Sequence, residues 1–283
     1  AWPIVRAGAW AEALPLLERL AMGNPALGPA TGVRFWTLYG ESLAELQLSP
    51  NLANEAIGRA AALAQDASDS AEVELAASRL ARARSDPHAE RSLLQAAIAR
   101  LDAQSSSEDG RAAEGRAHLA DLLVRSGELP AAVSAAGLAL RSGGHDLVRY
   151  ATTLGYTQLA VGQLGDAELT FRGAEARARA EGRTAWRAVA GLVLVLTAQG
   201  RYSDASELGE AGERSARSGA PAPRLAALQI AMAELDLALC RHGLARKRLD
   251  QAMDALHGEV TAQLEARVAL LRARIAWDGG EPE

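Results

Sequence analysis

The sequence contains few of the residue types that stabilise several common classes of protein. Only Cys240 among its 283 residues is a cysteine, so no disulfide can form within the chain and a cytoplasmic location is favoured. Aromatic residues make up only 4% of the chain, whereas β-sheets favour aromatic and β-branched residues. Alanine is abundant instead, and it favours helices that pack closely. The composition therefore predicts an all-α fold.

Long apolar runs and excess positive charge are also missing. The longest apolar run, 189–198, ends at Gln199 and is too short to cross a bilayer, and no signal peptide is visible. The net charge of −5 argues against nucleic acid as a direct partner, because binding to phosphates requires a basic face. We therefore expect neither membrane nor direct nucleic-acid contact from this segment. The chain also lacks an initial Met and begins within what reads as half a repeat, so we expect it to be part of a longer protein.

Residue groupings typical of enzymes and cofactor sites are missing as well. The five histidines form no pair at i, i+4 spacing, and Cys240 with His242 supplies only two of the ligands that a zinc site needs. No glycine-rich phosphate-binding loop is present, and no nucleophile, base and orienting acid can be assembled from neighbouring residues. We expect no metal, no cofactor and no enzymatic activity.

What the sequence does contain is a helical pattern that is clearest over 154–174. Gly155 lies midway in a first helix, where the missing side chain lets a second helix approach, and Gly162 ends that helix. The second helix has one apolar stripe at helical spacing, formed by Leu164, Ala167, Phe171 and Ala174. The small alanine is the point where the two helices can cross. This spacing resembles the tetratricopeptide repeat (TPR).

The pattern recurs along the chain, and one alanine marks the crossing point of each unit. These alanines are Ala13, Ala56, Ala89, Ala132, Ala167, Ala205 and Ala245. Their mean spacing is about 39 residues, against roughly 34 for the basic repeat, and helices longer by about a turn would explain the difference. The resemblance implies an all-α, right-handed α-solenoid of about seven TPR-like helix pairs with a C-terminal capping helix. The repeat length is also similar to that of the regulatory domains of large bacterial ATP-dependent transcription regulators of the maltose-activator type.

The repeats predict the organisation of the whole chain. The final helix has apolar residues on one side and charged residues elsewhere, which fits the polar outer face that a terminal repeat needs. We expect a single superhelical domain over 1–277, with weaker repeats over 1–103, clearer repeats over 108–257, a capping helix over 259–277 and a disordered tail over 278–283.

The third unit has the weakest pattern. Its second helix is expected to bury Ala89, Leu93 and Ala96, which recur at helical spacing. The polar segment 104–110 that follows has two interpretations, a flexible link or the start of a helix capped by one of its serines.

The expected binding surface is the concave groove, which is lined by the first helix of each pair. On the clearest unit the residues that project from the helix face not used for packing are Arg149, Thr152 and Tyr156. Tyr156 beside Arg149 is the pair we single out, because aromatic residues and arginine dominate the energetics of interfaces. The alternative is that Tyr156 packs on a neighbouring helix with its hydroxyl in water. The equivalent positions implied by the resemblance are Arg34, Thr37, Glu41, Glu74, Asp121, Arg187 and Glu234.

Two classes of function remain open. The first is a scaffold that binds a protein or peptide segment in its groove, from another chain or from the parent protein. The second is a sensor of a small molecule or peptide within a bacterial transcription regulator. Scattered charges of both signs favour a long open surface, and therefore the first class, over a closed apolar pocket. They also argue against a uniformly basic clamp for a peptide carboxylate. The basic run 246–248, with Arg241, is either a solvated helix face or a site for an acidic partner.

Overall fold

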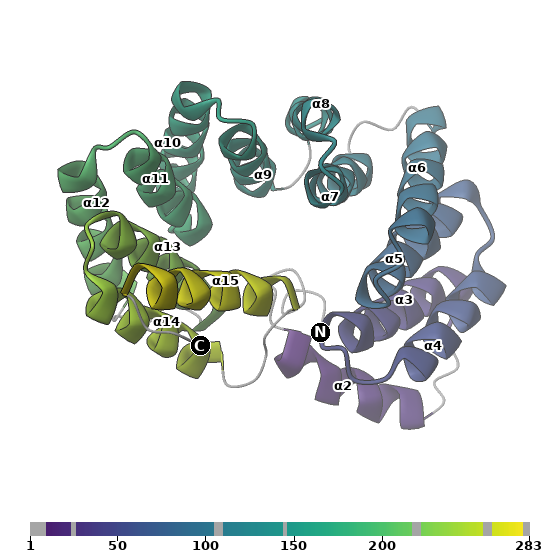
Figure 1. Cartoon of the computed structure of the whole chain (residues 1–283). Coiled ribbons are helices and arrows are strands. Elements are labelled where there is room, and N and C mark those ends of the chain that lie inside the picture. Colours follow the sequence, from purple (N-terminus) through teal and green to yellow (C-terminus); the bar gives the residue numbers. More distant parts are fainter. Residues whose placement is uncertain are drawn as a thin grey trace. The chain divides into compact units, whose positions relative to one another are not determined.

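The computed structural model describes residues 10–23, 27–104, 110–143, 146–216, 222–256 and 262–279. Across these ranges every regular element is an α-helix and no strand occurs, as Figure 1 shows. The all-α class expected from the composition is confirmed. The chain divides into two compact units, Ala1–His145 and Asp146–Glu283, and each is described by itself. The expectation of one domain over 1–277 stays a prediction.

The first unit is a set of helix pairs preceded by a single described helix. Helices α3 and α4, α5 and α6, and α7 and α8 pack as pairs, α2 packs on α3, and α3 also packs on α5. The helices are α2 (Trp10–Met22), α3 (Pro29–Glu45), α4 (Pro50–Leu63), α5 (Ala67–Ala83), α6 (Pro87–Ala103), α7 (Arg111–Arg125) and α8 (Leu129–Arg141).

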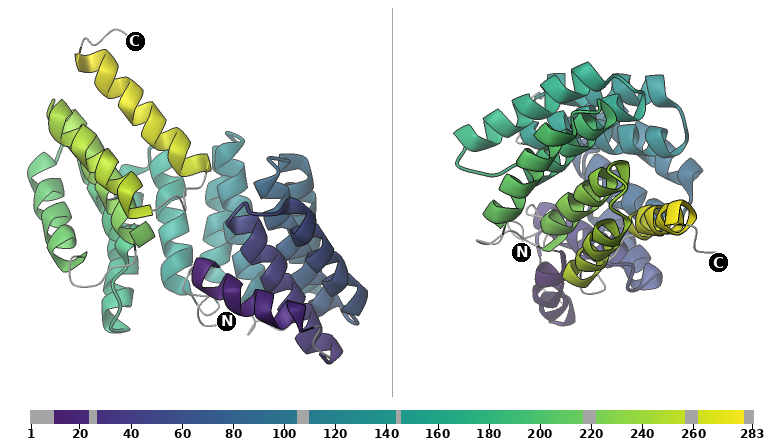
Figure 2. Two further views of the ribbon diagram at one scale, coloured as in Figure 1. Left: turned by 90° about the horizontal axis from the view of Figure 1, so that it is seen from below. Right: turned by 60° about the vertical axis from the view of Figure 1, so that its left-hand side comes forward.

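The second unit repeats this plan and ends in a single helix. Helices α9 and α10, α11 and α12, and α13 and α14 pack as pairs, α11 packs on α13, and α15 packs on α14 and α13 (Figure 2). The helices are α9 (Leu147–Ala160), α10 (Leu164–Ala180), α11 (Trp186–Ala198), α12 (Tyr202–Ala216), α13 (Ala222–Ala238), α14 (His242–Leu256) and α15 (Ala262–Gly279).

Helix length accounts for the long repeat period. Helices α3, α5, α6, α10 and α13 each contain 17 residues, or more than four turns at 3.6 residues per turn. The turns that join the two helices of a pair are tight. Gly127, Gly162 and Gly200 adopt φ values between 75° and 78°, the left-handed conformation that glycine favours at a helix end. Gln47, which stands in place of a turn glycine, adopts the same region with φ of 53°.

The crossing alanines are buried in six of the seven units. Ala13, Ala132, Ala167, Ala205 and Ala245 are 0% exposed, and all of these except Ala132 belong to clusters of apolar residues from neighbouring helices. The sixth, at position 56, is 2% exposed.

The expectation for the third unit was wrong by one residue. Helix α6 buries Glu90, Leu94, Ala97 and Leu101, so the predicted Ala89, Leu93 and Ala96 lie one position to the side. The alanine-rich sequence of α6 allows an apolar stripe in the predicted register and in the observed one. The observed register was not recognised because a glutamate, rather than an alanine, occupies its crossing position. Pro87 begins α6 and Glu90 follows three residues later, as Ala132 follows Leu129 in α8.

The final helix is only partly the cap that was expected. Val268, Leu271 and Ile275 are buried against α13 and α14, as predicted. The charged residues of the helix, Glu265, Arg267, Arg272 and Arg274, are exposed, as expected. The outer surface also contains apolar residues that were not expected there, because Leu270 is 70% exposed and Trp277 is 86% exposed.

The segments expected to be irregular fall largely outside the described residues. Residues 105–109 lie outside them, and the residue that precedes α7 is Gly110 with φ of 62° rather than a serine. Residues 280–283 of the expected tail also lie outside the described part, whereas residues 278 and 279 belong to α15.

Candidate functional site

The first helices of successive pairs in the second unit bring Tyr156, Arg187, Glu234 and Arg267 together, and we call these four residues the Tyr156 row. The Tyr156 hydroxyl on α9 donates a hydrogen bond to the backbone carbonyl of Arg187 on α11 at 2.9 Å. The Arg187 guanidinium lies over the same ring, 5.6 Å from its centroid. On α13, Glu234 accepts a hydrogen bond from Nη2 of Arg267 on α15 at 2.6 Å.

The position of Tyr156 follows from the helix packing beneath it. Gly155 and Gly191 leave room for the fully buried ring of Phe171, since a Cβ at either glycine would lie within 2.6 Å of that ring. Tyr156 contacts Phe171 edge to face, with ring centroids 5.0 Å apart, an arrangement that aromatic pairs favour. The Asp146 side chain accepts a hydrogen bond from the backbone N–H of residue 149 at 3.2 Å and fixes the start of α9.

Charges from three helices act on the Tyr156 phenol. Burial raises the pKa of Tyr156, the positive charges of Arg187 and Arg267 lower it in part, and Glu234 raises it further. All members of the row therefore lie within electrostatic reach of the hydroxyl. Since burial is the larger effect, the phenol stays protonated at neutral pH and remains a hydrogen-bond donor.

Arg187 differs from Arg267, the other arginine of the row, in its ion pairs. Its side chain is exposed, and among the residues that the structure describes no carboxylate forms an ion pair with it. Arg267, by contrast, is held by Glu234. An exposed guanidinium that rests on an aromatic ring is preorganised to bind a carboxylate or carbonyl of a partner, because its position is already fixed.

The first unit also has ion pairs between first helices. Arg79 on α5 forms ion pairs with Glu41 on α3 at 3.3 Å and with Glu114 on α7 at 2.6 Å. Its guanidinium also lies 5.4 Å from the Trp10 ring centroid on α2. This Arg79 cluster, defined as these four residues, connects four helices of the unit through one buried cation.

Several predicted groove residues of the first unit are used in such internal contacts. Thr37 is buried and donates a hydrogen bond to Glu72 at 3.1 Å. Asp121 pairs with Arg82 at 3.1 Å. The remaining predicted residues have these places: Glu41 belongs to the Arg79 cluster, Glu74 accepts a hydrogen bond from Arg100 at 2.9 Å, and Arg34 is exposed.

In the second unit the structure brings together three of the predicted residues. Tyr156, Arg187 and Glu234 belong to the Tyr156 row. The Arg149 guanidinium lies over the ring of Tyr150, 5.9 Å from its centroid, and Thr152 is buried with its hydroxyl bonded to a backbone carbonyl of its own helix. Tyr156 packs on Phe171 of the neighbouring helix α10, as the alternative expected, and its exposed hydroxyl donates a hydrogen bond to the backbone carbonyl of Arg187.

Sequence reasoning missed Arg267 and Arg79. Arg267 was assigned to the charged side of the last helix, and no residue of that helix indicates its pairing with a glutamate 33 residues earlier. Arg79 was not considered, since arginine is the most common cation of the chain. A signal was present in both cases, because each lies about one repeat length from the carboxylate that it binds.

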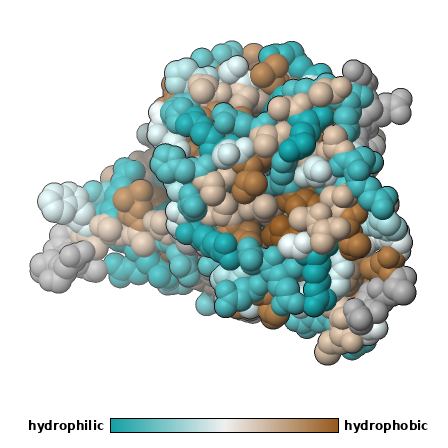
Figure 3. All heavy atoms as spheres, turned by 90° about the vertical axis from the view of Figure 1, so that its right-hand side faces the viewer, coloured by the Kyte–Doolittle hydropathy of each residue, from teal (hydrophilic) through white to brown (hydrophobic). Residues whose placement is uncertain are grey.

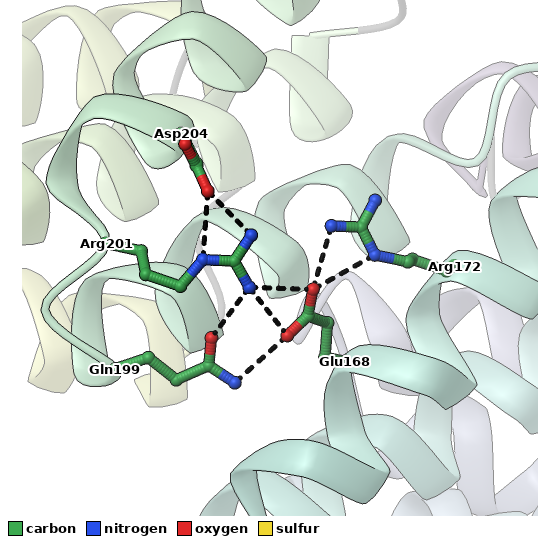
Figure 4. Close-up of polar contacts among 5 residues, drawn as sticks. All are labelled: Glu168, Arg172, Gln199, Arg201 and Asp204. Atoms are coloured by element: carbon green, nitrogen blue, oxygen red, sulfur yellow. Dashed lines mark hydrogen bonds and ion pairs between the residues drawn. The ribbon is translucent and has the colours of Figure 1, made fainter.

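A second polar network of the second unit joins α10 to the turn between α11 and α12. Glu168 on α10 accepts hydrogen bonds from Arg172, Gln199 and Arg201, and Arg201 also binds Asp204 on α12 at 2.6 Å (Figure 4). The hydrogen bond from Arg172 contributes most to keeping the pKa of Glu168 below its ordinary value, burial opposes it, and Gln199 and Arg201 assist. The network links one helix pair to the turn of the next.

One cavity in the second unit bears on the choice between scaffold and sensor. It has a volume of ≈ 280 Å³ and lies among α10, α11 and α12, with Trp186 and Val189 at its apolar side and Arg179 and Arg183 at its rim. Pockets for drug-sized ligands usually measure about 300–1,000 Å³. Both arginines bind carboxylates of the chain, Glu175 and Glu181 respectively.

The residues of the basic run 246–248, in α14, have different environments. Arg248 forms an ion pair with the buried Asp236 at 2.7 Å and another with Glu213, whereas Lys247 is exposed. A solvated helix face therefore describes only part of the run. Over the described ranges no group of three or more His, Cys, Asp or Glu side chains could hold a metal ion.

The surface of the molecule is mixed in character. Figure 3 shows a face that is largely hydrophilic, with apolar side chains exposed between polar ones. None of the helices in the described part of the chain is sufficiently long and apolar to span a membrane.

Solved structures with the same arrangement of helices are known, although no protein-family model matches the sequence and no curated protein is significantly similar to it. A Rap protein complexed with competence and sporulation factor is 16% identical, with a TM-score of 0.64, over 93% of this chain and 81% of that chain. The apo form of RapI is 13% identical, with a TM-score of 0.60, over 88% of this chain and 99% of that chain.

A third similar structure is a tetratricopeptide repeat protein from Parabacteroides merdae, which is 12% identical, with a TM-score of 0.58, over 97% of this chain and 95% of that chain. Sequence identities this low support a conclusion about the fold alone. The chain has the fold of an all-α solenoid built from TPR-like helix pairs.

Proposed function

We propose that the chain is a regulatory scaffold that binds a peptide or a protein segment through the Tyr156 row, without catalysis. The observation that carries this proposal is the exposed Arg187 guanidinium, fixed on the Tyr156 ring without an ion pair among the described residues. Tyrosine and arginine are the residue types that most often dominate binding energy at interfaces. The Rap protein that shares the fold is complexed with competence and sporulation factor, which supports a binding role.

The alternative is a sensor of a small molecule or peptide in a bacterial transcription regulator. The cavity beside Trp186 favours it, because its apolar side and charged rim could hold a small ligand. The volume of ≈ 280 Å³ and the ion pairs already made by its arginines make it the second choice.

A selection with random heptapeptides displayed on phage tests the proposal. We expect the wild-type chain to enrich peptides whose affinity falls at least about tenfold, or about 1.4 kcal/mol, in the variant Arg187→Glu. The matched control is Arg214→Glu, which makes the same charge change at an exposed arginine of α12. Fluorescence anisotropy with the selected peptides measures both affinities.

Peptides that bind wild type and Arg187→Glu equally well would contradict the role of the Tyr156 row. A library that yields no binder, together with a small molecule retained in native mass spectrometry, would favour the sensor. In that case Trp186→Ala should release the molecule, and Arg187→Glu should not.

A further inference from the structure

The exposed face of α15 repeats a face that is covered elsewhere in the same unit. Helix α13 uses one apolar face, Ala226, Ile230, Ala233 and Leu237, to pack in a single cluster with Ala245, Leu249 and Ala252 of α14. The residues 40 positions later are Ala266, Leu270, Ala273 and Trp277. We call these four residues the α15 face, and all of them are exposed.

The opposite faces of the two helices match in the same register. Leu228, Ala231 and Leu235 of α13 are buried against the preceding helix pair. The residues 40 positions later, Val268, Leu271 and Ile275, are the buried residues of α15. The crossing alanines of α12 and α14, at 205 and 245, are separated by the same interval. Helix α15 thus packs on the preceding helix pair in the way that the first helix of a pair does. The face that would contact a second helix is exposed.

We propose that the α15 face is a docking surface for an amphipathic helix of the second-helix type. The occupant has a small residue at the crossing point, a large apolar residue four positions later and a small residue three positions after that. Helix α14 has this pattern in Ala245, Leu249 and Ala252, and α10 has it in Ala167, Phe171 and Ala174. The argument rests on continuity with the interface between α13 and α14, since the same residue pattern on α13 binds such a helix.

The exposed groups on α15 have the properties of a binding surface. Leu270 and Trp277 are 70% and 86% exposed, and they lie two turns apart on one side of the helix. Two alanines alternate with them, which leaves the backbone accessible to close approach. Large apolar side chains in this arrangement are typical of protein interaction sites, and tryptophan is among the residues that contribute most to binding.

A chimera tests the proposal in the intact chain. A copy of Leu239–Leu256 is joined directly after Asp278, which restores the interval between α13 and its second helix. We expect acrylamide quenching of Trp277 to be lost in this chimera and the urea midpoint of unfolding to rise. The contribution of Trp277 is isolated by repeating each measurement with the variant Trp277→Phe.

Two controls make the result specific to the α15 face. A chimera with Ala245→Glu and Leu249→Glu in the appended copy only should leave Trp277 quenchable. Leu270→Glu in the α15 face should likewise remove the protection, and this position is exposed, so the variant retains its fold. Equal quenching of Trp277 in the matched and the mismatched chimera would overturn the proposal. Self-association of the unmodified chain that Leu270→Glu abolishes, seen by sedimentation velocity, would also overturn it, because a second copy would then be the occupant.

Discussion

At the residue scale, Glu41 shows how much the fold changes the properties of one side chain. It is 9% exposed and lies on α3, opposite Arg79. Burial raises the pKa of Glu41 to about 7, Arg79 opposes this effect, and Glu114, Glu45 and Glu72 add to it. The positive charge of Arg79 is in turn stabilised by Glu41 and Glu114 against the cost of burial, so its pKa stays above the usual value.

The raised pKa of Glu41 predicts a stability that declines as pH rises. A carboxyl group with a higher pKa in the folded state binds more protons folded than unfolded between pH 4.5 and about 7, so its contribution is present below that window and lost through it. We expect the free energy of unfolding to fall by about 1–3 kcal/mol between about pH 5 and pH 8. Urea titrations at a series of pH values measure this change.

The variant Glu41→Gln separates this effect from other titrations. Glutamine has the same shape and does not titrate, so the decline with pH should flatten. Glu55→Gln, which changes an exposed carboxylate of α4, should keep the slope of the wild type. A slope unchanged by Glu41→Gln would assign the pH dependence to other groups.

At the scale of the element, α6 departs from the repeat by placing a charge where the other second helices place alanine. Glu90 is 2% exposed, and one of its carboxylate oxygens accepts a hydrogen bond from Arg125 on α7 at 2.7 Å. Arg125 is more accessible, with 29% of its side chain exposed, and it also lies 3.5 Å from Asp121. Glu90 therefore depends more on Arg125 for compensation of its charge than Arg125 depends on Glu90.

We predict that removing the arginine costs more stability than removing the glutamate. Arg125→Ala leaves the Glu90 charge buried and without compensation, which typically costs about 3–5 kcal/mol. Glu90→Ala restores the residue usual at this position, and Arg125 keeps Asp121 as a partner, so we expect a loss of about 1–2 kcal/mol. Urea unfolding of both variants measures the difference, and the reverse order would mean that Glu90 stabilises α6 by packing rather than by its charge.

The sequence predicted elements better than partners of individual residues. Helix pairs, tight turns and buried alanines followed from local spacing, because these depend on residues within one or two turns. Glu90 was missed because α6 offers alanines in two registers. The contact of Tyr156 with Arg187 was also missed, because the pair singled out, Tyr156 and Arg149, shares one helix. Arg187 comes from the next pair, and its contact depends on how α9 and α11 pack.

At the scale of the whole molecule, the two compact units predict unfolding in more than one step. Contacts in repeat folds are local, so regions of different stability need not unfold together. The N-terminal unit, which contains the weaker repeats over 1–103, is expected to unfold first. Hydrogen exchange followed by mass spectrometry at increasing urea should show 1–145 losing protection before 146–283, and simultaneous loss would contradict this order.

The substitution Gly155→Ala should destabilise the second unit alone. Gly155→Ala places a Cβ 2.6 Å from the ring of Phe171 and should cost about 1–3 kcal/mol by overpacking. Gly165→Ala, where no atom lies within 4 Å, is the matched control and should be neutral or slightly stabilising. We expect faster exchange over 146–283 and unchanged exchange over 1–145.

The register shared by α13 and α15 means that the same surface returns after 40 residues in the second unit. Ala226 and Ile230 of α13 form this surface and pack against α14, and Ala266 and Leu270 of α15 occupy the same positions. A change of 40 residues between α13 and α15 would keep this register, whereas deletion of α7 would leave the buried Glu90 without Arg125. The length of the chain can therefore change in whole periods only where no such ion pair joins the two repeats.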